Sequence, residues 1–186
     1  MKVILTGHTR GIGGALNRQM QSRGWEVSGF SQSTGYNLNS AHTFNEILRE
    51  AETADIFINN AHHGFAQTNL LYDWFNKFRS NAEKIHVIVG SHAADFVHSH
   101  PHRYEIQKRS IDHACQNLWF SPHANGPQAK VILAKLGLTD TDMVKGLEWA
   151  QGRPSLTPDY VAEKILWTID QALLPGGYIR EISISP

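Results

Sequence analysis

The chain has 186 residues, 41% of them hydrophobic, which is enough for one compact domain with a buried core. Lysine and arginine together number 17, as do aspartate and glutamate, so the chain lacks the basic excess of nucleic-acid-binding proteins. No apolar run reaches transmembrane length, and the single cysteine, Cys115, excludes an internal disulfide. We therefore expect one cytoplasmic domain over residues 1–186, with neither a nucleic-acid nor a membrane partner.

Short β-rich runs alternate with helical patterns along the chain. Strands are predicted at 2–6, 26–30, 55–59, 85–90, 130–134 and 178–184. Helices are predicted at 11–23, 40–52, 68–80, 101–118 and 158–173. The strand segments are nearly continuous apolar runs, which is typical of parallel strands buried on both faces. The alternation predicts an α/β fold with one Rossmann-like, doubly wound parallel sheet and helices on both of its faces.

The first predicted strand leads directly into a glycine-rich turn, TGHTRGIGGAL, which opens a helix. Glycines at 7, 11 and 13 allow a tight turn and the close approach of a pyrophosphate to the backbone. The helix N-terminus then supplies N–H donors and the positive end of a dipole. The pattern indicates a dinucleotide site, although an ordinary strand-to-helix loop can also be rich in glycine.

Three residues between positions 91 and 108 are candidates for one catalytic unit. Ser91 follows a predicted strand, where its hydroxyl can hydrogen-bond a substrate oxygen. Tyr104 and Lys108 are four residues apart and therefore share a helix face. A nearby ammonium favours the phenolate, which lowers the phenol pKa towards the range useful for acid–base catalysis. An isolated pair at this spacing would more often be a packed aromatic and a solvated lysine.

Five motifs, in order, resemble those of the short-chain dehydrogenase/reductase family. TGHTRGIG resembles the family's TGxxxGIG turn, NNA at 59–61 its NNAG motif, and Ser91 with YEIQK its catalytic serine and YxxxK. LGLTDT at 136–141 resembles its PGxxxT segment, with Leu136 in place of proline, and TPDYVAEKI resembles its last helix. The resemblance covers nearly the whole chain and implies a single NAD(P)-binding domain. It also implies about seven strands, the third being a short strand at 36–39.

The resemblance implies an NADP(H)-dependent oxidoreductase that transfers a hydride between nicotinamide and a small carbonyl or alcohol substrate. Tyr104 would exchange the proton, Ser91 would hold the substrate oxygen, and Lys108 would serve both the phenol and the nicotinamide ribose. The family adds an asparagine on the preceding helix, for which Asn69 is the first choice and Asn76 the second, and either could instead be a surface residue. The implied cofactor-binding residues follow the ends of several strands: Gly7, Thr9, Arg10, Gly11, Ile12, Gly13, Ser31, Asn37, Leu38, Asn60, Ala61, Tyr104, Lys108, Gly137, Thr139 and Thr141.

The segment VSGFSQST indicates a preference for NADP(H) over NAD(H). It has no acidic residue at the end of the second strand, where NAD-preferring members bind the ribose 2′-hydroxyl. Arg10 lies where NADP-preferring members place a basic residue for the 2′-phosphate, and Ser31, Ser33 and Thr34 could add hydroxyl donors. Arg10 could also be a solvated loop residue. Asn37 or Asn39 would take the place of the family's adenine-contacting aspartate.

The histidines are the main departure from the family pattern. His98, His100 and His102 form an H-x-H-x-H run, which admits a metal site, but no carboxylate or cysteine cluster accompanies it in the sequence. We predict that the protein binds no metal and that the run borders the substrate pocket. His62 stands where the family has a glycine, and its side chain would narrow the pocket near the nicotinamide.

Two function classes therefore remain open. The intact serine, tyrosine and lysine favour an enzyme. Fewer residues separate Asn60 from Ser91 than the family normally has, so the resemblance implies a shortened helix before Ser91. This helix, His62 and the short segment between Thr141 and Thr157 favour a non-catalytic NADP(H)-binding sensor or interaction module. A metal-dependent hydrolase is a distant third possibility. By resemblance, we expect a homodimer or homotetramer.

Overall fold

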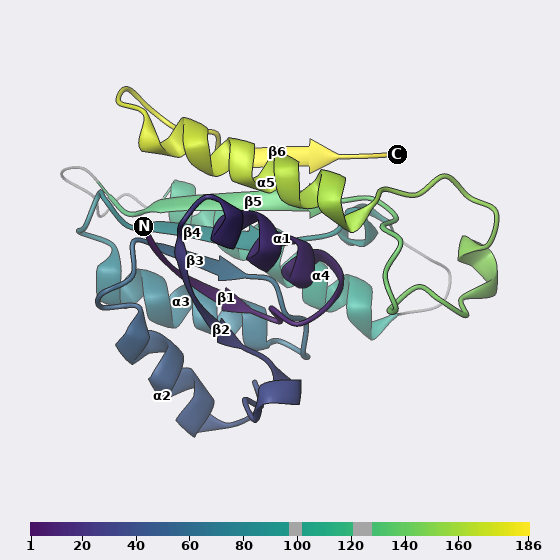
Figure 1. The fold of residues 1–186 in the computed structure, drawn as a ribbon, viewed down its shortest axis with the longest axis horizontal. Helices are drawn as coiled ribbons and strands as arrows, with labels where there is room; N and C mark the ends of the chain where they lie inside the picture. The colour runs from purple at the N-terminus through teal and green to yellow at the C-terminus, as the bar shows by residue number, and fades with distance from the viewer. Residues whose placement is uncertain (97–101, 121–127) are drawn as a thin grey trace.

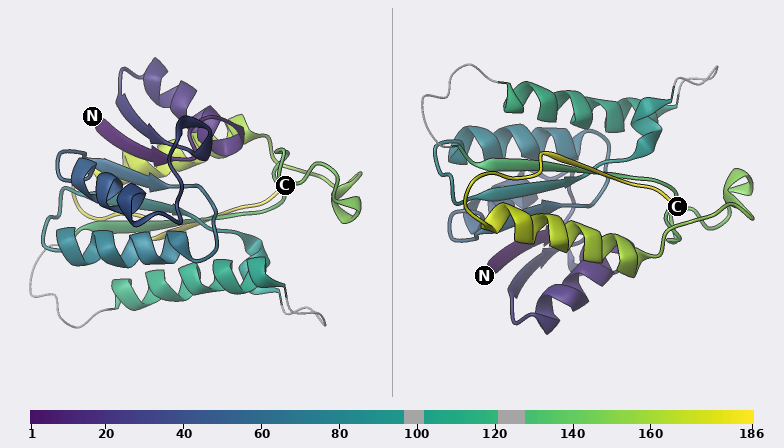
Figure 2. Two further views of the ribbon diagram at one scale, coloured as in Figure 1. Left: turned by 90° about the horizontal axis from the view of Figure 1, so that it is seen from below. Right: turned by 90° about the horizontal axis from the view of Figure 1, so that it is seen from above.

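The computed structural model describes residues 1–96, 102–120 and 128–186, which form three layers with a parallel sheet in the middle (Figures 1 and 2). The six strands pair in the order β2-β1-β3-β4-β5-β6, and every pair is parallel. The strands are β1 (Lys2–Thr6), β2 (Glu26–Phe30), β3 (Ile56–Asn59), β4 (Ile85–Val89), β5 (Lys130–Leu136) and β6 (Glu181–Ile184). The helices are α1 (Gly11–Ser22), α2 (Ala41–Glu50), α3 (Ala66–Phe78), α4 (Arg103–Trp119) and α5 (Pro158–Leu173).

Alternate residues of each strand contribute to two separate cores. Val3 and Leu5 pack with α1 and α5 on one face of the sheet. Ile4, between them, packs with α2, α3 and α4 on the other face. Figure 2 shows these two helix layers on opposite sides of the sheet. The central strands are therefore buried on both faces, and the predicted doubly wound parallel sheet is confirmed.

The start of α5 follows the sequence prediction closely. Thr157 is its N-cap, and the hydroxyl oxygen accepts a hydrogen bond from the N–H of Tyr160 at 3.2 Å. Pro158 occupies the first helical turn, where its missing N–H costs nothing. The predicted start of α4 at position 101 lies outside the described residues, and α4 is described from Arg103 onward.

The predicted count of about seven strands is wrong for the described part of the chain, which forms six. The segment 36–39 is a turn and not a strand. The Asn37 side-chain oxygen accepts a hydrogen bond from the N–H of Asn39 at 2.9 Å, so a local turn replaces a ladder bond. Because no strand forms there, β2 is the edge of the sheet. β6 is also shorter than the predicted strand at 178–184.

No helix within residues 1–96, 102–120 and 128–186 is long and apolar enough to cross a membrane.

His86 lies at the centre of the core, on β4. Its ring stacks on Phe57, with 4.4 Å between the ring centres, and meets Trp74 edge-on at 4.7 Å. Neither ring nitrogen has a hydrogen-bond partner among the described residues. Burial lowers the pKa of this imidazole to about 3, so the folded protein holds it neutral.

We predict that His86→Leu makes stability less sensitive to acid. Between pH 6.5 and 3 the unfolded chain binds a proton at this histidine and the folded chain does not, so the free energy of unfolding falls by about 1.4 kcal/mol per pH unit. Between pH 7.5 and pH 5 the variant should lose about 2 kcal/mol less than the wild type, measured by urea unfolding. The exposed His113, changed to Gln, should keep the wild-type dependence, and identical pH dependence in both variants would contradict the prediction.

Candidate active site

The glycine turn after β1 leaves the first turn of α1 open to an anion. Gly7 has a φ of +74°, which favours glycine, and a Cβ added at Gly13 would lie 2.0 Å from the Gly7 carbonyl oxygen. The helix and the turn can therefore pack this closely only with glycine at 13. Within the described residues, no side chain caps the helix at Arg10 and the first turn holds no acidic residue. Its N–H groups and dipole thus suit a phosphate.

The turn is bonded to the end of β3. The hydroxyl oxygen of Thr6 accepts hydrogen bonds from the N–H groups of Asn60 at 2.9 Å and Ala61 at 3.0 Å. The Asn60 side-chain amide donates in return to the Thr6 carbonyl oxygen at 3.0 Å. The NNA segment and the glycine turn are consequently hydrogen-bonded to each other at the carboxyl edge of the sheet.

The segment 137–141, after β5, lies against the same glycine turn. A Cβ added at Gly11 would lie 3.3 Å from the methyl carbon of Thr141, so these two predicted residues are neighbours. Thr139 is buried, and its hydroxyl donates to the Gly137 carbonyl oxygen at 3.1 Å. The structure therefore gathers the expected cofactor-binding residues of the glycine turn, of 60–61 and of 137–141 at one edge, where parallel sheets bind ligands.

Several side chains that were expected to contact the adenosine part of the cofactor are buried or bonded to other side chains in the structure. Ser31 is buried, and its hydroxyl lies 3.0 Å from Nδ1 of His8. The Thr9 and Ser33 hydroxyls are 3.1 Å apart. Arg10 is exposed, and its guanidinium lies 3.9 Å from the Asp142 carboxylate, a distance at which an exposed pair holds it only weakly. Leu38 is buried next to the turn at Asn37.

Ser91, Tyr104 and Lys108 lie close together in the structure. Ser91 follows β4 and caps the 3₁₀ turn η2 (His92–Asp95), where its hydroxyl oxygen accepts the Ala93 N–H at 3.2 Å. The Ser91 side chain also hydrogen-bonds with Tyr104, in the first turn of α4. Nζ of Lys108, one turn further on, lies 5.7 Å from the centre of the tyrosine ring.

Lys108 is held by a glutamine that the sequence analysis missed. Its ammonium donates to the side-chain oxygen of Gln67 at 2.8 Å and to the Val89 carbonyl oxygen at 2.9 Å. The amide nitrogen of Gln67 donates to the carbonyl oxygens of Asn59 at 2.8 Å and Val89 at 3.2 Å.

The structure does not bring Asn69 or Asn76 to Lys108, because both side chains are exposed. α3 begins at Ala66, two residues before the predicted start, so Gln67 lies in its first turn. Helical spacing places Gln67 on the same face as the buried Leu71 and Trp74. That spacing is the signal in the sequence that could have identified Gln67.

Burial favours the neutral forms of both Tyr104 and Lys108. Burial raises the pKa of the Tyr104 phenol, and the Ser91 hydrogen bond opposes this only in part. Burial also lowers the pKa of Lys108 to about 7, against the attraction of the Asp112 carboxylate. The pKa of the phenol is therefore raised in this structure, in the direction opposite to the one that a nearby positive charge would produce.

An ion-pair cluster, buried at Lys135 and Asp112 and exposed at Asp95, fixes the turn that carries Ser91. Lys135 of β5 pairs with Asp112 of α4 at 2.9 Å and with Asp95 of η2 at 2.5 Å. His92 of the same turn lies 2.8 Å from the Ser183 hydroxyl on β6, measured from Nε2. These contacts join η2 to α4 and to two strands, which holds Ser91 in register with Tyr104.

The histidine run can be assessed only in part, because His98 and His100 lie outside the described residues. His102 is exposed and precedes α4. Across the ranges that the structure describes, no group of three or more His, Cys, Asp or Glu side chains is placed to hold a metal ion.

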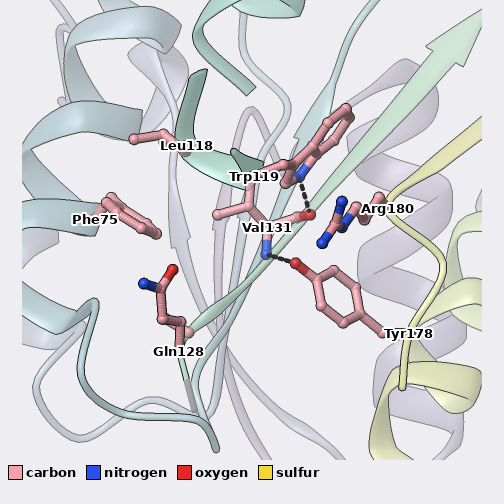
Figure 3. A pocket seen from close by; sticks show the side chains of 8 residues that line it. Phe75, Leu118, Trp119, Gln128, Val131, Tyr178 and Arg180 are labelled. Carbon is pink, nitrogen blue, oxygen red and sulfur yellow. Dashed lines mark hydrogen bonds between the residues drawn. The ribbon is translucent and has the colours of Figure 1, made fainter. Parts of the chain in front are cut away.

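A separate cavity of about 160 Å³ lies at the opposite end of β5 (Figure 3). The Trp119 ring nitrogen donates to the Val131 carbonyl oxygen at 2.9 Å, and the Val131 N–H lies 3.5 Å from the Tyr178 hydroxyl oxygen. These polar groups therefore bond to the strand. The cavity lies near the start of β5, whereas the site residues 137–141 follow its end, so we do not place the active site there.

Several solved structures share this fold over almost the whole chain. A short-chain dehydrogenase from Burkholderia cenocepacia in complex with NADP superposes with a TM-score of 0.77 at 15% identity, covering 100% of this chain and 88% of that one. The closed form of a serine dehydrogenase complexed with NADP+ gives 0.74 at 16% identity, covering 99% and 94%. A short-chain dehydrogenase/reductase from Burkholderia phymatum in complex with NAD gives 0.74 at 13% identity, covering 99% and 88%.

No protein-family model and no curated protein matches the chain. The structural similarity shows that the chain has the Rossmann-like fold of the short-chain dehydrogenases/reductases.

We predict that Gln67→Ala destabilises the fold by about 2–4 kcal/mol, because the Lys108 ammonium and two buried carbonyl oxygens lose a partner. Asn69→Ala is the matched control, two residues away on the exposed face of the same helix, and should change stability by no more than about 0.5 kcal/mol. Urea unfolding at pH 7.5 measures both. Equal effects of the two substitutions would show that Gln67 has no structural role at this site.

Proposed function

We propose that the protein is an NADP(H)-dependent oxidoreductase of the short-chain dehydrogenase/reductase type. The observation that carries the proposal is the meeting of Ser91, Tyr104 and Lys108 at the carboxyl edge of the sheet, next to the glycine turn. The substrate class is a small carbonyl compound or the corresponding alcohol.

The edge of the sheet fits a dinucleotide. The open first turn of α1 suits the pyrophosphate. Asn60, Ala61 and the 137–141 segment lie next to it at the carboxyl edge of the sheet. Tyr104 and Lys108 would hold the nicotinamide ribose. When bound, the nicotinamide supplies or accepts the hydride.

The protein's own residues manage the proton. In the direction of reduction, Tyr104 donates its phenolic proton to the carbonyl oxygen, and the raised pKa keeps it protonated at neutral pH. Ser91 hydrogen-bonds the same oxygen and aligns it with the phenol. Lys108, held by Gln67, stabilises the phenolate that remains and takes the position that the resemblance assigns to it.

We propose that NADP(H) is preferred over NAD(H). No acidic residue follows β2, and Arg10 reaches solvent at the mouth of the site with only a weak partner. A guanidinium binds a 2′-phosphate well. Two of the similar structures are complexes with NADP, and one is a complex with NAD.

We also propose that the protein forms a homodimer or homotetramer. Tyr72 on α3 and Ile106 on α4 expose large apolar side chains, which supports such an assembly. We propose a cytoplasmic location, supported by the single buried cysteine.

The second candidate is a non-catalytic NADP(H)-binding sensor or interaction module. The observation that favours it is the His62 ring, which packs against Tyr104. The short-chain dehydrogenase/reductase family has a glycine at this position. NADPH binding without reduction of any carbonyl substrate would select this candidate over the enzyme.

We predict that Tyr104→Phe lowers carbonyl reduction by roughly 100-fold or more, because only the proton-donating hydroxyl is lost. NADPH affinity and stability should change little, since the ring remains. Steady-state rates with a panel of small carbonyl compounds, and NADPH fluorescence titration, measure the two effects. Tyr72→Phe is the control for loss of an exposed phenol, and should retain full activity. Unchanged turnover in Tyr104→Phe would refute the mechanism.

We predict that Arg10→Ala weakens NADPH binding by roughly tenfold or more and leaves NADH binding nearly unchanged, because only NADPH carries the 2′-phosphate. Arg18→Ala, on the helix that follows Arg10 and paired with Asp159, controls for loss of an exposed positive charge. Titration of both cofactors against each variant gives the comparison. Equal losses for NADPH and NADH in Arg10→Ala would overturn the assignment.

A further inference from the structure

The loop after β3 places the His62 ring on the catalytic pair. The His62 and Tyr104 ring centres are 4.9 Å apart with the planes at 74°, so the rings meet edge to face. The imidazole also interacts with the Lys108 ammonium and with the Gln67 and Gln107 side chains. His62 thus packs on the tyrosine and lies within electrostatic reach of the lysine, next to the glutamine that holds the lysine.

This position is unfavourable for the imidazole. Its Nδ1 is shielded from solvent and has no hydrogen-bond partner among the described residues. Burial, followed by the positive charge of Lys108, lowers the pKa of His62 to about 4. The Gln67 and Gln107 side chains compensate the ring only in part, because Nδ1 stays unpaired, and leaving the position would restore the hydration of that nitrogen.

Lys108 is only 3% exposed, although its proposed task is to meet a ligand. Gln67 and the Val89 carbonyl oxygen accept from its ammonium on the protein side. The Tyr104 ring centre lies 5.7 Å from this ammonium, and the His62 ring packs edge to face on Tyr104. Of these two rings, Tyr104 is fixed on a helix and bonded to Ser91.

His62, in contrast, lies on a segment without regular structure, two residues before Gly64. Gly64 has a φ of +52°, and a Cβ built there would meet no atom within 4 Å. The loop therefore has room to shift, and His62 is the side chain that can move away from Lys108.

We propose that His62 is a displaceable cover over Lys108, which must turn outward before the ribose of a nicotinamide cofactor reaches the ammonium. This inference rests on the proposed function. Displacement of the ring subtracts from the intrinsic affinity for the cofactor, because only the uncovered fraction of the protein is competent to bind. His62 is thus a positioning residue that sets cofactor affinity and takes no part in the chemistry.

The cover also makes cofactor binding depend on pH. In place, the ring faces Lys108 and Tyr104 from α4 and His63 from its own loop. The positive charge of Lys108, and of His63 when protonated, keeps the covered imidazole neutral. Once displaced, the ring regains a pKa of about 6.5, so acid favours the uncovered form. Between pH 6.5 and 4 the affinity of the wild type should rise, as pH falls, relative to a variant without the ring.

The first test measures access to Lys108 in the protein alone. An amine-acylating reagent is applied at pH 7.5, and the labelling rate of each lysine is followed by peptide mass spectrometry. His62→Ala should raise the rate at Lys108 by roughly fivefold or more, because an amine with a pKa near 7 reacts readily once exposed. His63→Ala, the exposed neighbour, should leave it unchanged.

Lys135, 9% exposed and outside the cover, serves as the internal reference. An unchanged rate at Lys108 in His62→Ala, or an equal rise at Lys135, would overturn the proposal.

The second test titrates NADPH against the wild type and the two variants at pH 5.5 and 7.5. His62→Ala should bind roughly fivefold more tightly at pH 7.5, and the gain should shrink at pH 5.5. Binding by the wild type with no gain in His62→Ala would refute a cover that opposes the cofactor. Faster labelling of Lys108 without NADPH binding by any of the three proteins would retain the cover and reject the proposed cofactor.

Discussion

The buried ammonium of Lys108 is the constraint around which the rest of the site is arranged. A cation out of water is costly unless it finds acceptors, and here a side-chain oxygen of α3 and a carbonyl oxygen of β4 supply them. Gln67 can present its oxygen only because its own amide nitrogen is bonded to the ends of β3 and β4. The need to satisfy one charge therefore fixes α3 and α4 relative to two strands.

Parallel pairing brings the glycine turn and the NNA segment together. Strands that run the same way end at the same edge, so segments distant in sequence meet there. Thr6 then joins the two segments directly, since its hydroxyl oxygen accepts hydrogen bonds from the N–H groups of both Asn60 and Ala61. The glycine turn and the NNA segment are therefore placed by the pairing of β1 with β3 and linked by these hydrogen bonds.

The same reasoning explains what the sequence could and could not predict. Continuous apolar runs identified the strands because burial on both faces imposes that pattern, and Thr157-Pro158 identified the start of α5 through capping chemistry. The turn at Asn37 was missed because a side-chain hydrogen bond replaced the ladder bond expected from the family pattern. Gln67 was missed because it fell outside a helix predicted to begin at 68. Directions of pKa shift were also beyond reach, since they depend on burial that no local pattern encodes.

Burial acts on Tyr104, Lys108 and His62 in one direction, towards the neutral form of each, and it leaves Lys108 as the group of the three whose charge changes near pH 7. A neutral phenol is the form that can donate a proton, and burial favours this form of Tyr104. A lysine with a pKa near 7 can still respond, because a phenolate formed beside it would favour the ammonium again. Gln67 and the Val89 carbonyl oxygen hold this amine inside the protein, where only 3% of the residue is exposed. Two requirements therefore oppose each other at Lys108: the desolvation that lowers its pKa, and the access that a ligand of the lysine needs.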